Sequence, residues 1–491
     1  MNIYNTEQIR NWDAYTIKNE PIASINLMER AATAIVNELD KKNYENKPFY
    51  IFCGPGNNGG DGLAIARLLT QQDIIVHVFI LESKKYSADF TANLQRLQHL
   101  DVAIKEIDGA EEFPIIPQNA IIIDALFGSG LTRPLQGLSK ILVQHINQHK
   151  GQIIAIDIPS GLFADKTSKG NNIVKATTTF SFQSPKLAFM MAENEEYLGE
   201  FGLLDIGLHQ DYTAAVNADH ELLELGFVRS LILPRNRFSH KYQHGHAWLF
   251  VGSPGMYGAG ILSASACMKS GVGLVSIMVQ KEYLNIYQTA VPEAICIIDW
   301  DLEKSAGKKT ALGIGPGWDV ADGYPDITKA ALSTLQIPMV VDAAALQMLA
   351  QGLKLPAGSI ITPHVGEFEK CFGKSENDFE RLELALAKAK ELDLYIVLKG
   401  AHTLVVTPQG KSYFNNTGNP GMAKAGSGDV LTGLLTGLLA QGYEPLHACL
   451  LGVYLHGLAG DRAEKTHTQF AMTAMDIVHH FGEAWKIVVG S

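Results

Sequence analysis

The residues best suited to chemistry in the first half of the chain lie in one glycine-rich run, GPGNNGGDG, at 54–62. The run follows an apolar segment and precedes the helical pattern LAIARLL. Glycines let a backbone turn tightly and approach a ligand without Cβ clashes, and the start of a helix presents free amides to an anion. The spacing is not G-x-G-x-x-G, so the run is not the usual dinucleotide fingerprint. We interpret it as a site for a phosphate-bearing ligand; the alternative is a strained turn that binds nothing.

Three aspartates stand in loops of this half. Asp61 belongs to the glycine-rich run, Asp124 opens DALFGSGLTRPLQG (124–137), and Asp157 opens DIPSG (157–161). The carboxyl ends of parallel strands meet at one edge of an open sheet, where ligands bind. Three acids in one cleft suit acid–base work or a hard cation held by oxygen ligands. The alternative for any single aspartate is a helix N-cap or a turn former.

The second half has its own glycine-rich run, NTGNPGMAKAGSGDVLTGLLTGLLAQG, at 416–442. We expect the amides of Gly426, Ser427 and Gly428 to form an anion hole at the start of a helix, strengthened by the helix dipole. Asp429 would then sit where a base could meet a hydroxyl beside a transferable phosphate. No G-x-x-x-x-G-K-[ST] run occurs, which excludes a P-loop enzyme. The alternative is a glycine-rich turn with Asp429 as its N-cap.

The elements that must position these loops alternate along the first half. Asn5 and Gln8 have capping-box spacing before a first helix, and Ile25 to Leu39 is a second amphipathic run. Short apolar runs then predict buried strands and alternate with helical segments, which indicates a mostly parallel sheet covered by helices on both faces. The predicted strands are 48–53, 74–81, 120–127 and 152–159, and the predicted helices are 63–70, 87–98 and 138–148.

The alternation of apolar runs and helical segments begins again after a segment of mixed character at 208–235, so we place the domain junction near 215–225. No sequence repeat relates the halves, which predicts a fusion of two different α/β units, 1–218 and 225–491. The apolar stretch from Val430 to Gly460 is interrupted too often to span a bilayer and predicts buried helices. The predicted strands of the second half are 247–253, 273–279, 311–317, 338–344, 359–364, 395–400 and 402–407.

Composition limits the classes of function. The 491 residues are 46% hydrophobic and carry a net charge of −11, which favours globular domains and disfavours a nucleic-acid partner. The polar N-terminus has no signal-peptide pattern, and no segment predicts a membrane partner. We therefore expect a cytoplasmic protein with reduced thiols, because the odd number of cysteines includes no C-x-x-C pair. The cysteines are Cys53, Cys267, Cys296, Cys371 and Cys449.

GPGNNGGDG, DALFGSGL and DIPSG together resemble the YjeF N-terminal family, the NAD(P)H-hydrate epimerases, over roughly 1–215. The resemblance implies a Rossmann-like three-layer α/β/α domain, with Asp157 as the acid–base group. It also implies a potassium ion bound by Asn58, Asp124 and Ser160; carboxylate, amide and hydroxyl oxygens suit such a hard cation. The implied ligand contacts are Asn57, Asn58, Gly59, Gly60, Asp61, Gly128, Ser129, Gly130, Leu131, Thr132, Arg133, Pro134 and Asp157.

The G-S-G-D arrangement resembles the ribokinase-like superfamily. With SHKYQHGHAWLFVGSPGMYGAG, GIGPG, TPHVGEF and LKGAHT, it looks like the YjeF C-terminal family, the ADP- or ATP-dependent NAD(P)H-hydrate dehydratases, over roughly 225–491. The resemblance implies a ribokinase-like α/β domain that consumes ADP, with Mg²⁺ as charge neutraliser. The implied contacts to the hydrated dinucleotide are Ala259, Gly317, His364 and Asp429. The implied contacts to the adenine nucleotide are Lys399, Gly400, Ala401, His402, Thr403 and Gly428.

Two positions depart from the pattern of that family. Ala344 stands in DAAAL where many relatives read Asp-Ala-Asp-Ala-Leu. Lys424 stands where a small hydroxyl residue is expected, and it could contact phosphate or be solvated. His240, His244 and His246 lack the carboxylate or cysteine spacing that would make them a metal site.

We therefore expect a bifunctional repair enzyme for NADH and NADPH hydrates, acting as a homo-oligomer. Its first half would interconvert the R and S epimers. In its second half Asp429 would accept the hydroxyl proton of the S epimer, ADP would phosphorylate that hydroxyl, and phosphate would leave with the ring nitrogen assisting, which releases AMP and phosphate. One alternative is a ribokinase-like kinase of a small molecule. Another is a first half that binds nucleotide without catalysis.

Overall fold

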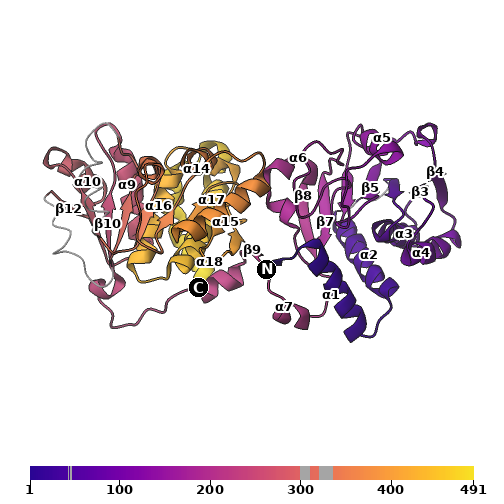
Figure 1. The fold of residues 1–491 in the computed structure, drawn as a ribbon, viewed down its shortest axis with the longest axis horizontal. Helices are drawn as coiled ribbons and strands as arrows, with labels where there is room; N and C mark the ends of the chain where they lie inside the picture. Colours follow the sequence, from indigo (N-terminus) through magenta and orange to yellow (C-terminus); the bar gives the residue numbers. More distant parts are fainter. Residues whose placement is uncertain (43, 45–46, 299–309, 320–334, 491) are drawn as a thin grey trace. The chain divides into compact units, whose positions relative to one another are not determined.

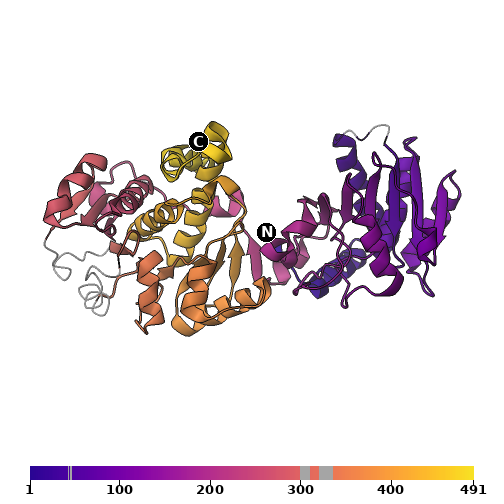
Figure 2. The same cartoon turned by 90° about the horizontal axis from the view of Figure 1, so that it is seen from above.

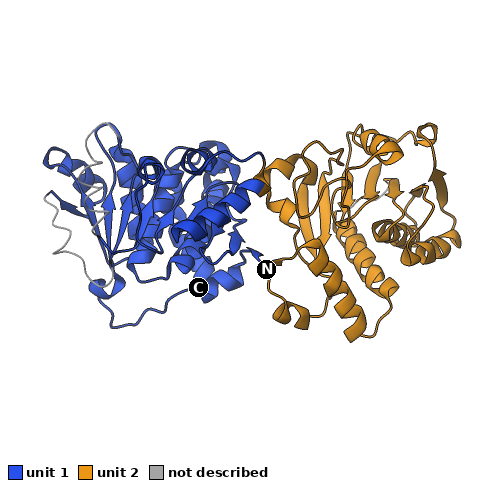
Figure 3. Cartoon of the chain, in the orientation of Figure 1, with its two compact units in different colours: residues 1, 219–376, 380–491 blue, residues 2–218, 377–379 orange. Residues whose placement is uncertain are grey.

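The computed structural model describes residues 1–42, 44, 47–298, 310–319 and 335–490. The chain forms two compact units. The N-terminal unit contains residues 2–218 and 377–379, and the C-terminal unit contains residues 1, 219–376 and 380–491 (Figure 3). Among the described residues, no helix combines the length and apolar character that a bilayer span needs.

The sheet of the N-terminal unit has the strand order β4-β3-β2-β5-β6-β7-β8. Each neighbouring pair is parallel, as the βαβ alternation predicts. The strands are β2 (Phe49–Cys53), β3 (Val76–Leu81), β4 (Ala103–Ile107), β5 (Ile121–Ala125), β6 (Ile153–Ile156), β7 (Thr178–Phe182) and β8 (Glu200–Leu204). The helices are α1 (Thr6–Asn19), α2 (Ser24–Lys41), α3 (Asn57–Thr70), α4 (Ala88–Gln98), α5 (Gly137–Ile146), α6 (Glu195–Leu198) and α7 (Asp211–Ala215).

Helices cover both faces of this sheet (Figure 1). Alternate residues along β2 point to opposite faces: Ile51 packs in one buried cluster with α2, α3 and α4, and Phe52 packs in another with α5. These two clusters make the unit a three-layer α/β/α sandwich, which confirms the predicted fold class. The Asn5–Gln8 capping box at the start of α1 is also confirmed.

The sheet of the C-terminal unit contains the run β9-β18-β17-β16-β15-β14-β13-β10-β11-β12. Neighbours from β12 to β16 are parallel, whereas β17 is antiparallel to both β16 and β18. The strands are β9 (His220–Leu222), β10 (His246–Phe250), β11 (Leu274–Met278), β12 (Ile295–Ile297), β13 (Thr310–Ile314), β14 (Met339–Val341), β15 (Ile360–Ile361), β16 (Tyr395–Leu398), β17 (Leu404–Val406) and β18 (Ser412–Phe414). The mixed α/β architecture predicted for this half is confirmed.

One helix forms the centre of this unit. Every residue of α16 from Val430 to Ala440 is buried, because the helix is apolar on all sides. Helices α17 and α18, drawn in yellow, lie side by side next to it (Figures 1 and 2). The helices are α8 (Leu225–Ser230), α9 (Tyr257–Lys269), α10 (Leu284–Ala290), α13 (Leu346–Ala350), α14 (Val365–Phe372), α15 (Asp378–Leu392), α16 (Ser427–Ala440), α17 (Pro445–Ala471) and α18 (Ala474–Val489).

Seven of the described strands lack a counterpart in the sequence prediction, among them the two-residue strand β1 (Asn2–Ile3). β4 and β8 are edge strands with half-exposed polar residues, so their apolar signal is weak. β9, β12 and β18 have only three residues each, and β7 is rich in Thr and Ser. β9 lies in residues 219–224, between the two domains predicted from the sequence, and it pairs with β18.

Candidate active sites

A buried polar cluster joins two strand ends in the N-terminal unit. Asp124, on β5, is fully buried, and its carboxylate accepts hydrogen bonds from the amide and the hydroxyl of Ser160 at 2.8 and 2.6 Å and from the Leu126 amide at 3.2 Å. Burial raises the pKa of Asp124 to about 6, although these hydrogen bonds lower it. Asn58 is also buried, and its side-chain nitrogen has no hydrogen-bond partner. The expected potassium ligands therefore combine a carboxylate, a hydroxyl and an amide with unused bonding capacity.

Asp157 lies directly after β6 in a left-handed backbone conformation, with φ of 66°. Its Oδ1 is 2.8 Å from the ammonium of Lys186, which is 1% exposed, and its Oδ2 accepts the Ser129 amide at 3.1 Å. Burial opposes ionisation, but Lys186 and Ser129 together lower the pKa of Asp157 below its usual value. The geometry holds an ionised carboxylate at the wall of a cavity, as a general base requires.

A cavity of about 460 Å³ is lined by Asn58 and Asp157, whereas Asp124 and Ser160 do not line it. It lies between the glycine-rich start of α3, the loop after β5 and the residue after β6, at the carboxyl edge of the sheet. Gly59, Gly60, Thr132, Arg133 and Pro134 do not line it. The expected ligand residues that line it are Asn57, Asn58, Asp61, Gly128, Ser129, Gly130, Leu131 and Asp157.

The remaining expected contacts of this half lie outside the cavity for two reasons. Gly59 and Gly60 are buried. A Cβ on Gly59 would lie 1.7 Å from the Gly54 carbonyl oxygen, and a Cβ on Gly60 would lie 2.9 Å from the Met28 side chain. Thr132, Arg133 and Pro134 are exposed on the far part of the loop.

Sequence reasoning missed four polar residues that line the same cavity. They are Thr6, Arg10 and Asp13 from α1, and Lys186. Burial, and next the charge of Asp157, raise the pKa of Asp13 to about 7. Burial also raises the pKa of Asp61 well above its usual value. Lys186 is the one residue with a sequence signal, because a lysine directly before the apolar run LAFMM is unusual.

In the C-terminal unit, the start of α16 provides the expected anion site. Gly426 is its N-cap, with φ of 95° and no capping side chain. Among the described residues, the amides of Gly426, Gly428 and Asp429 donate to no backbone carbonyl, whereas the Ser427 amide donates to the Lys424 carbonyl oxygen at 3.4 Å. Two of the three amides expected for the anion hole, those of Gly426 and Gly428, are therefore free, and the Asp429 amide is free beside them.

The Asp429 carboxyl lies among other charges. Burial, and next the charge of Asp342, raise the pKa of Asp429 to about 6, and Lys399 lowers it. Lys399 Nζ is 2.8 Å from Asp342 Oδ1, and Thr432 on α16 donates to the other Asp342 oxygen at 2.8 Å. A Cβ on Gly428 would lie 3.3 Å from Lys399 Nζ and 3.5 Å from Asp342 Oδ2, so this ion pair lies beside the start of α16. The free amides and the ammonium thus lie close to a carboxyl that can accept a proton.

Other expected residues lie at the same edge of the sheet. A Cβ on Gly317 would lie 2.9 Å from the Ala259 methyl group, so the two positions are in contact. His364 follows β15 and caps α14, where its ring accepts the Glu367 amide at 3.3 Å and its side chain stays 58% exposed. Lys399 to Thr403 form the turn between β16 and β17. Because β10 to β16 run parallel, all these loops follow carboxyl ends of strands.

One half-buried histidine, His456, lies next to the start of α16 and was not predicted. Its Nε2 is 3.4 Å from the Ser427 hydroxyl. Burial lowers the pKa of His456 to about 4, so the ring is neutral at physiological pH. It supports the loop as an uncharged hydrogen-bonding group.

The structure shows the surroundings of Lys424 and Ala344, the two residues that depart from the family pattern. The Lys424 ammonium donates to the carbonyl oxygens of Phe470 and Met472, both at 2.7 Å, and the residue is exposed. Ala344 lines a hollow of about 250 Å³ beside His364, and its short side chain leaves that space open.

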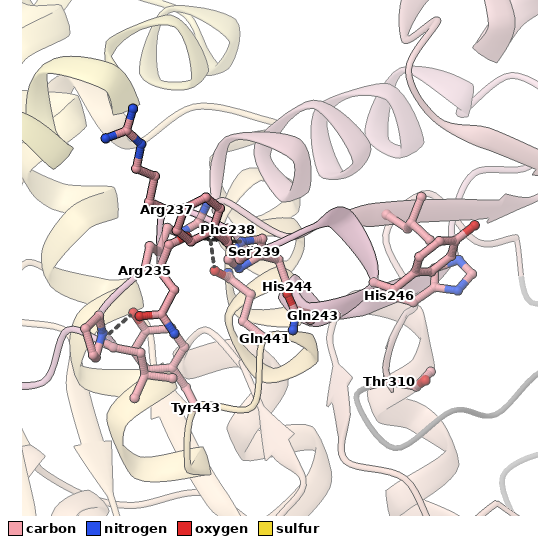
Figure 4. A pocket seen from close by; sticks show the side chains of 16 residues that line it. Arg235, Arg237, Phe238, Ser239, Gln243, His244, His246, Thr310, Gln441 and Tyr443 are labelled. Atoms are coloured by element: carbon pink, nitrogen blue, oxygen red, sulfur yellow. Dashed lines mark hydrogen bonds between the residues drawn. The ribbon is translucent and has the colours of Figure 1, made fainter.

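A cavity of about 1170 Å³ lies at the opposite edge of the C-terminal sheet (Figure 4). The first residues of β10, β11 and β13 line it, so it is at the amino ends of strands, away from Asp429. Arg235, which lines it, donates to the Gln441 side chain at 2.8 Å. His244 and His246 each pair with a serine hydroxyl, and no cluster of metal-ligating side chains occurs in the described ranges.

Comparison with known proteins separates the same two halves. Residues 24–188 match the family described as YjeF-related protein N-terminus, and residues 247–481 match the family described as NAD(P)H-hydrate dehydratase. A relative from Moorella thermoacetica, named bifunctional NAD(P)H-hydrate repair enzyme Nnr, is 35% identical and covers 93% of this chain and 91% of its own. One of the same name from Coxiella burnetii is 32% identical and covers 97% and 98%.

Solved structures resemble the C-terminal unit. A ribokinase-like superfamily protein from Enterococcus faecalis has a TM-score of 0.50 and 26% identity, covering 56% of this chain and 98% of its own. An ADP/ATP-dependent NAD(P)H-hydrate dehydratase from Bacillus subtilis, co-crystallised with ATP/Mg²⁺, has a TM-score of 0.49 and 31% identity, covering 55% and 98%. The nearly full-length similarity to named relatives is decisive. The chain belongs to the family of bifunctional NAD(P)H-hydrate repair enzymes, with an epimerase half followed by an ADP/ATP-dependent dehydratase half.

Proposed function

We propose that Asp429 is the base of the dehydratase half and that the start of α16 binds the phosphate transferred from ADP. The observation that carries this proposal is the pair of free amides at Gly428 and Asp429, with the Lys399 ammonium beside Gly428. Helix N-termini with free amides stabilise phosphate oxygens, and a carboxyl at the same place can take a proton from a nearby hydroxyl.

The proposed dehydration proceeds in two steps. Asp429 accepts the proton of the ring hydroxyl of the S hydrate as that oxygen takes the terminal phosphoryl group of ADP, and AMP leaves. Phosphate then departs with the C–O electron pair while the nitrogen lone pair forms a C=N bond, and loss of a proton from the neighbouring ring carbon to water restores the dihydronicotinamide. Mg²⁺ bound with the nucleotide would neutralise phosphate charge. Only one epimer can place its hydroxyl in line with phosphorus, so the other must first be inverted.

In the epimerase half, we propose Asp157 as an acid–base group at the hydrated ring. The cavity of about 460 Å³ would hold the ring. The glycine-rich loops that border it would hold the phosphates. Asp124, Ser160 and Asn58 fit a potassium ion, because a carboxylate, a hydroxyl and a side-chain amide each supply an oxygen, the ligand atom that a hard cation prefers. Such an ion would fix the loops after β5 and β6 and contribute positive charge near the ligand.

A single incubation tests the assignment. Mixed epimers of NADH hydrate are added to the full chain, with and without ADP and Mg²⁺, and the absorbance of reduced nicotinamide is followed. We expect complete recovery that depends on nucleotide, with AMP and phosphate released. A stable phosphorylated product without recovery would instead indicate a small-molecule kinase.

A further inference from the structure

The cavity of the epimerase half is lined by more carboxyl groups than the proposed chemistry uses. Its lining includes Asp13, Asp61 and Asp157, against the cations Lys186 and Arg10. Three carboxyls in a partly buried space cannot all ionise without large mutual repulsion. Their environments therefore decide which of them keeps its proton.

Asp157 is the carboxyl that the structure keeps ionised. Lys186 is almost fully buried and directs its ammonium to Asp157 at 2.8 Å, and Ser181 accepts a second hydrogen bond from the same ammonium at 2.9 Å. The Ser129 amide donates to the other Asp157 oxygen. The buried cation is therefore bound to this acid and not to the other two.

Asp13 has the opposite environment. It comes from α1, an element separate from the strand end that carries Asp157, and its carboxyl makes no hydrogen bond among the described residues. The charged groups that face it are Asp157, Lys186, Asp61 and Arg10. Burial and the negative charge of Asp157 raise the pKa of Asp13 to about 7, so near neutrality a large fraction is protonated.

We propose that Asp13 is the second proton-transfer group of the epimerase site and acts as the general acid while Asp157 acts as the base. This inference rests on the epimerase function proposed above. Inversion at one carbon needs a group on each face of the ring, and these two acids line one cavity from different elements. Two carboxyls whose environments push their pKa values apart are a recurrent acid–base arrangement.

The proposed step conserves atoms and electrons. Asp13 donates its proton to the ring hydroxyl, the C–O bond breaks with its electron pair going to the departing water, and the nitrogen lone pair forms a C=N bond. A water then attacks the other face, the C=N pair returns to nitrogen, and Asp157 takes a proton from that water. The proton returns to Asp13 because Asp13 is the weaker acid of the two. No oxidant or reductant is needed.

Asp13→Asn tests the role in the full chain. With mixed epimers, ADP and Mg²⁺, wild-type recovery has a fast phase from the S epimer and a second phase that depends on inversion of the R epimer. We expect Asp13→Asn to slow the second phase by about 100-fold or more and to leave the fast phase unchanged. Glu7→Gln, an exposed acid on the same helix, is the matched control and should change neither phase.

The pH profile of the wild-type chain gives a test that needs no variant. We expect the second phase to slow as pH rises through about 7, because Asp13 loses its proton, while the fast phase does not. A second phase that stays flat from about pH 6 to about pH 9, or an Asp13→Asn chain that matches the wild type, overturns the inference. Absence of any enzyme-dependent second phase in the wild type overturns the epimerase assignment instead.

Discussion

Asp157 and Asp429 have the same side chain and opposite surroundings. A buried lysine keeps Asp157 ionised, whereas burial and a neighbouring carboxylate raise the pKa of Asp429 to about 6. Asp429 can therefore accept a proton and release it again near neutral pH, which suits a base that must turn over. At the residue scale, local charge and burial thus assign different roles to two chemically identical groups.

The dehydratase rate should follow the ionisation of Asp429. The base form is present above its pKa of about 6, so the rate of nucleotide-dependent recovery should be constant above that pH and fall about tenfold for each unit below it. Asp429→Asn should reduce the rate by at least about 100-fold at all pH values. Steady-state recovery with the pure S epimer measures both, and a rate that does not change down to about pH 5 contradicts the assignment.

The buried ion pair between Lys399 and Asp342 should also contribute to stability. Lys399→Met leaves the Asp342 carboxylate, which is 2% exposed, without its cation and should lower the free energy of unfolding by about 3 kcal/mol. Lys411→Met removes a more exposed and longer pair with Glu221 and should cost less than about 1 kcal/mol. Urea denaturation compares the two variants. Equal losses would show that Asp342 is held mainly by Thr432.

Motif reasoning found the residues that stand in glycine-rich loops and missed those that do not. Asp61, Asp157 and Asp429 could be predicted because strand ends and helix starts mark them in the sequence. Asp13 could not, because an acid in an amphipathic helix has no local sign that tertiary packing will place it in a cavity. Lys186 has a local sign, because it directly precedes the apolar run LAFMM, but its pairing with Asp157 depends on how the chain after β7 folds back.

At the scale of elements, helices α9 and α16 determine where Asp429 lies. Gly433 allows the close approach of the two helices, and Ser263 on α9 donates to the Asp429 carbonyl oxygen at 2.9 Å. The strands with long apolar runs could be predicted, because the same apolar residues that bury them mark them in the sequence. β4, β8 and β18 are short or half-exposed, and their strand conformation depends on pairing with a neighbouring strand.

Gly433→Ala should disturb that helix contact. The added Cβ would lie 1.9 Å from the Ser263 carbonyl oxygen, so α16 must shift, and we expect a loss of about 2 kcal/mol of stability together with slower dehydration. Gly482→Ala on α18 is the control, because its Cβ meets nothing within 4 Å and should stabilise the helix by about 0.5 kcal/mol. Thermal unfolding and the recovery assay report both effects. If Gly433→Ala is as stable as the wild type, the contact between α9 and α16 adjusts without a loss of folding free energy.

At the scale of the whole molecule, two different sheets serve one substrate. The first is a parallel sheet with the proposed proton-transfer cavity at its carboxyl edge, and the second is a mixed sheet with the proposed phosphate site at the same kind of edge. Each unit has its own buried core. The two chemistries are therefore separable in principle, and the hydrate that one half inverts must reach the other half.

Mixing two inactivated chains tests how the hydrate travels between the halves. Asp157→Asn should convert the S epimer and leave the R epimer, and Asp429→Asn should invert epimers without restoring NADH. Because a released hydrate diffuses in solution, an equimolar mixture should recover as much NADH as the wild type. The amount recovered, measured by absorbance after the fast phase, decides the point. If the mixture stops where Asp157→Asn alone stops, the hydrate passes only within one chain, and the fusion of the two units is then required for repair.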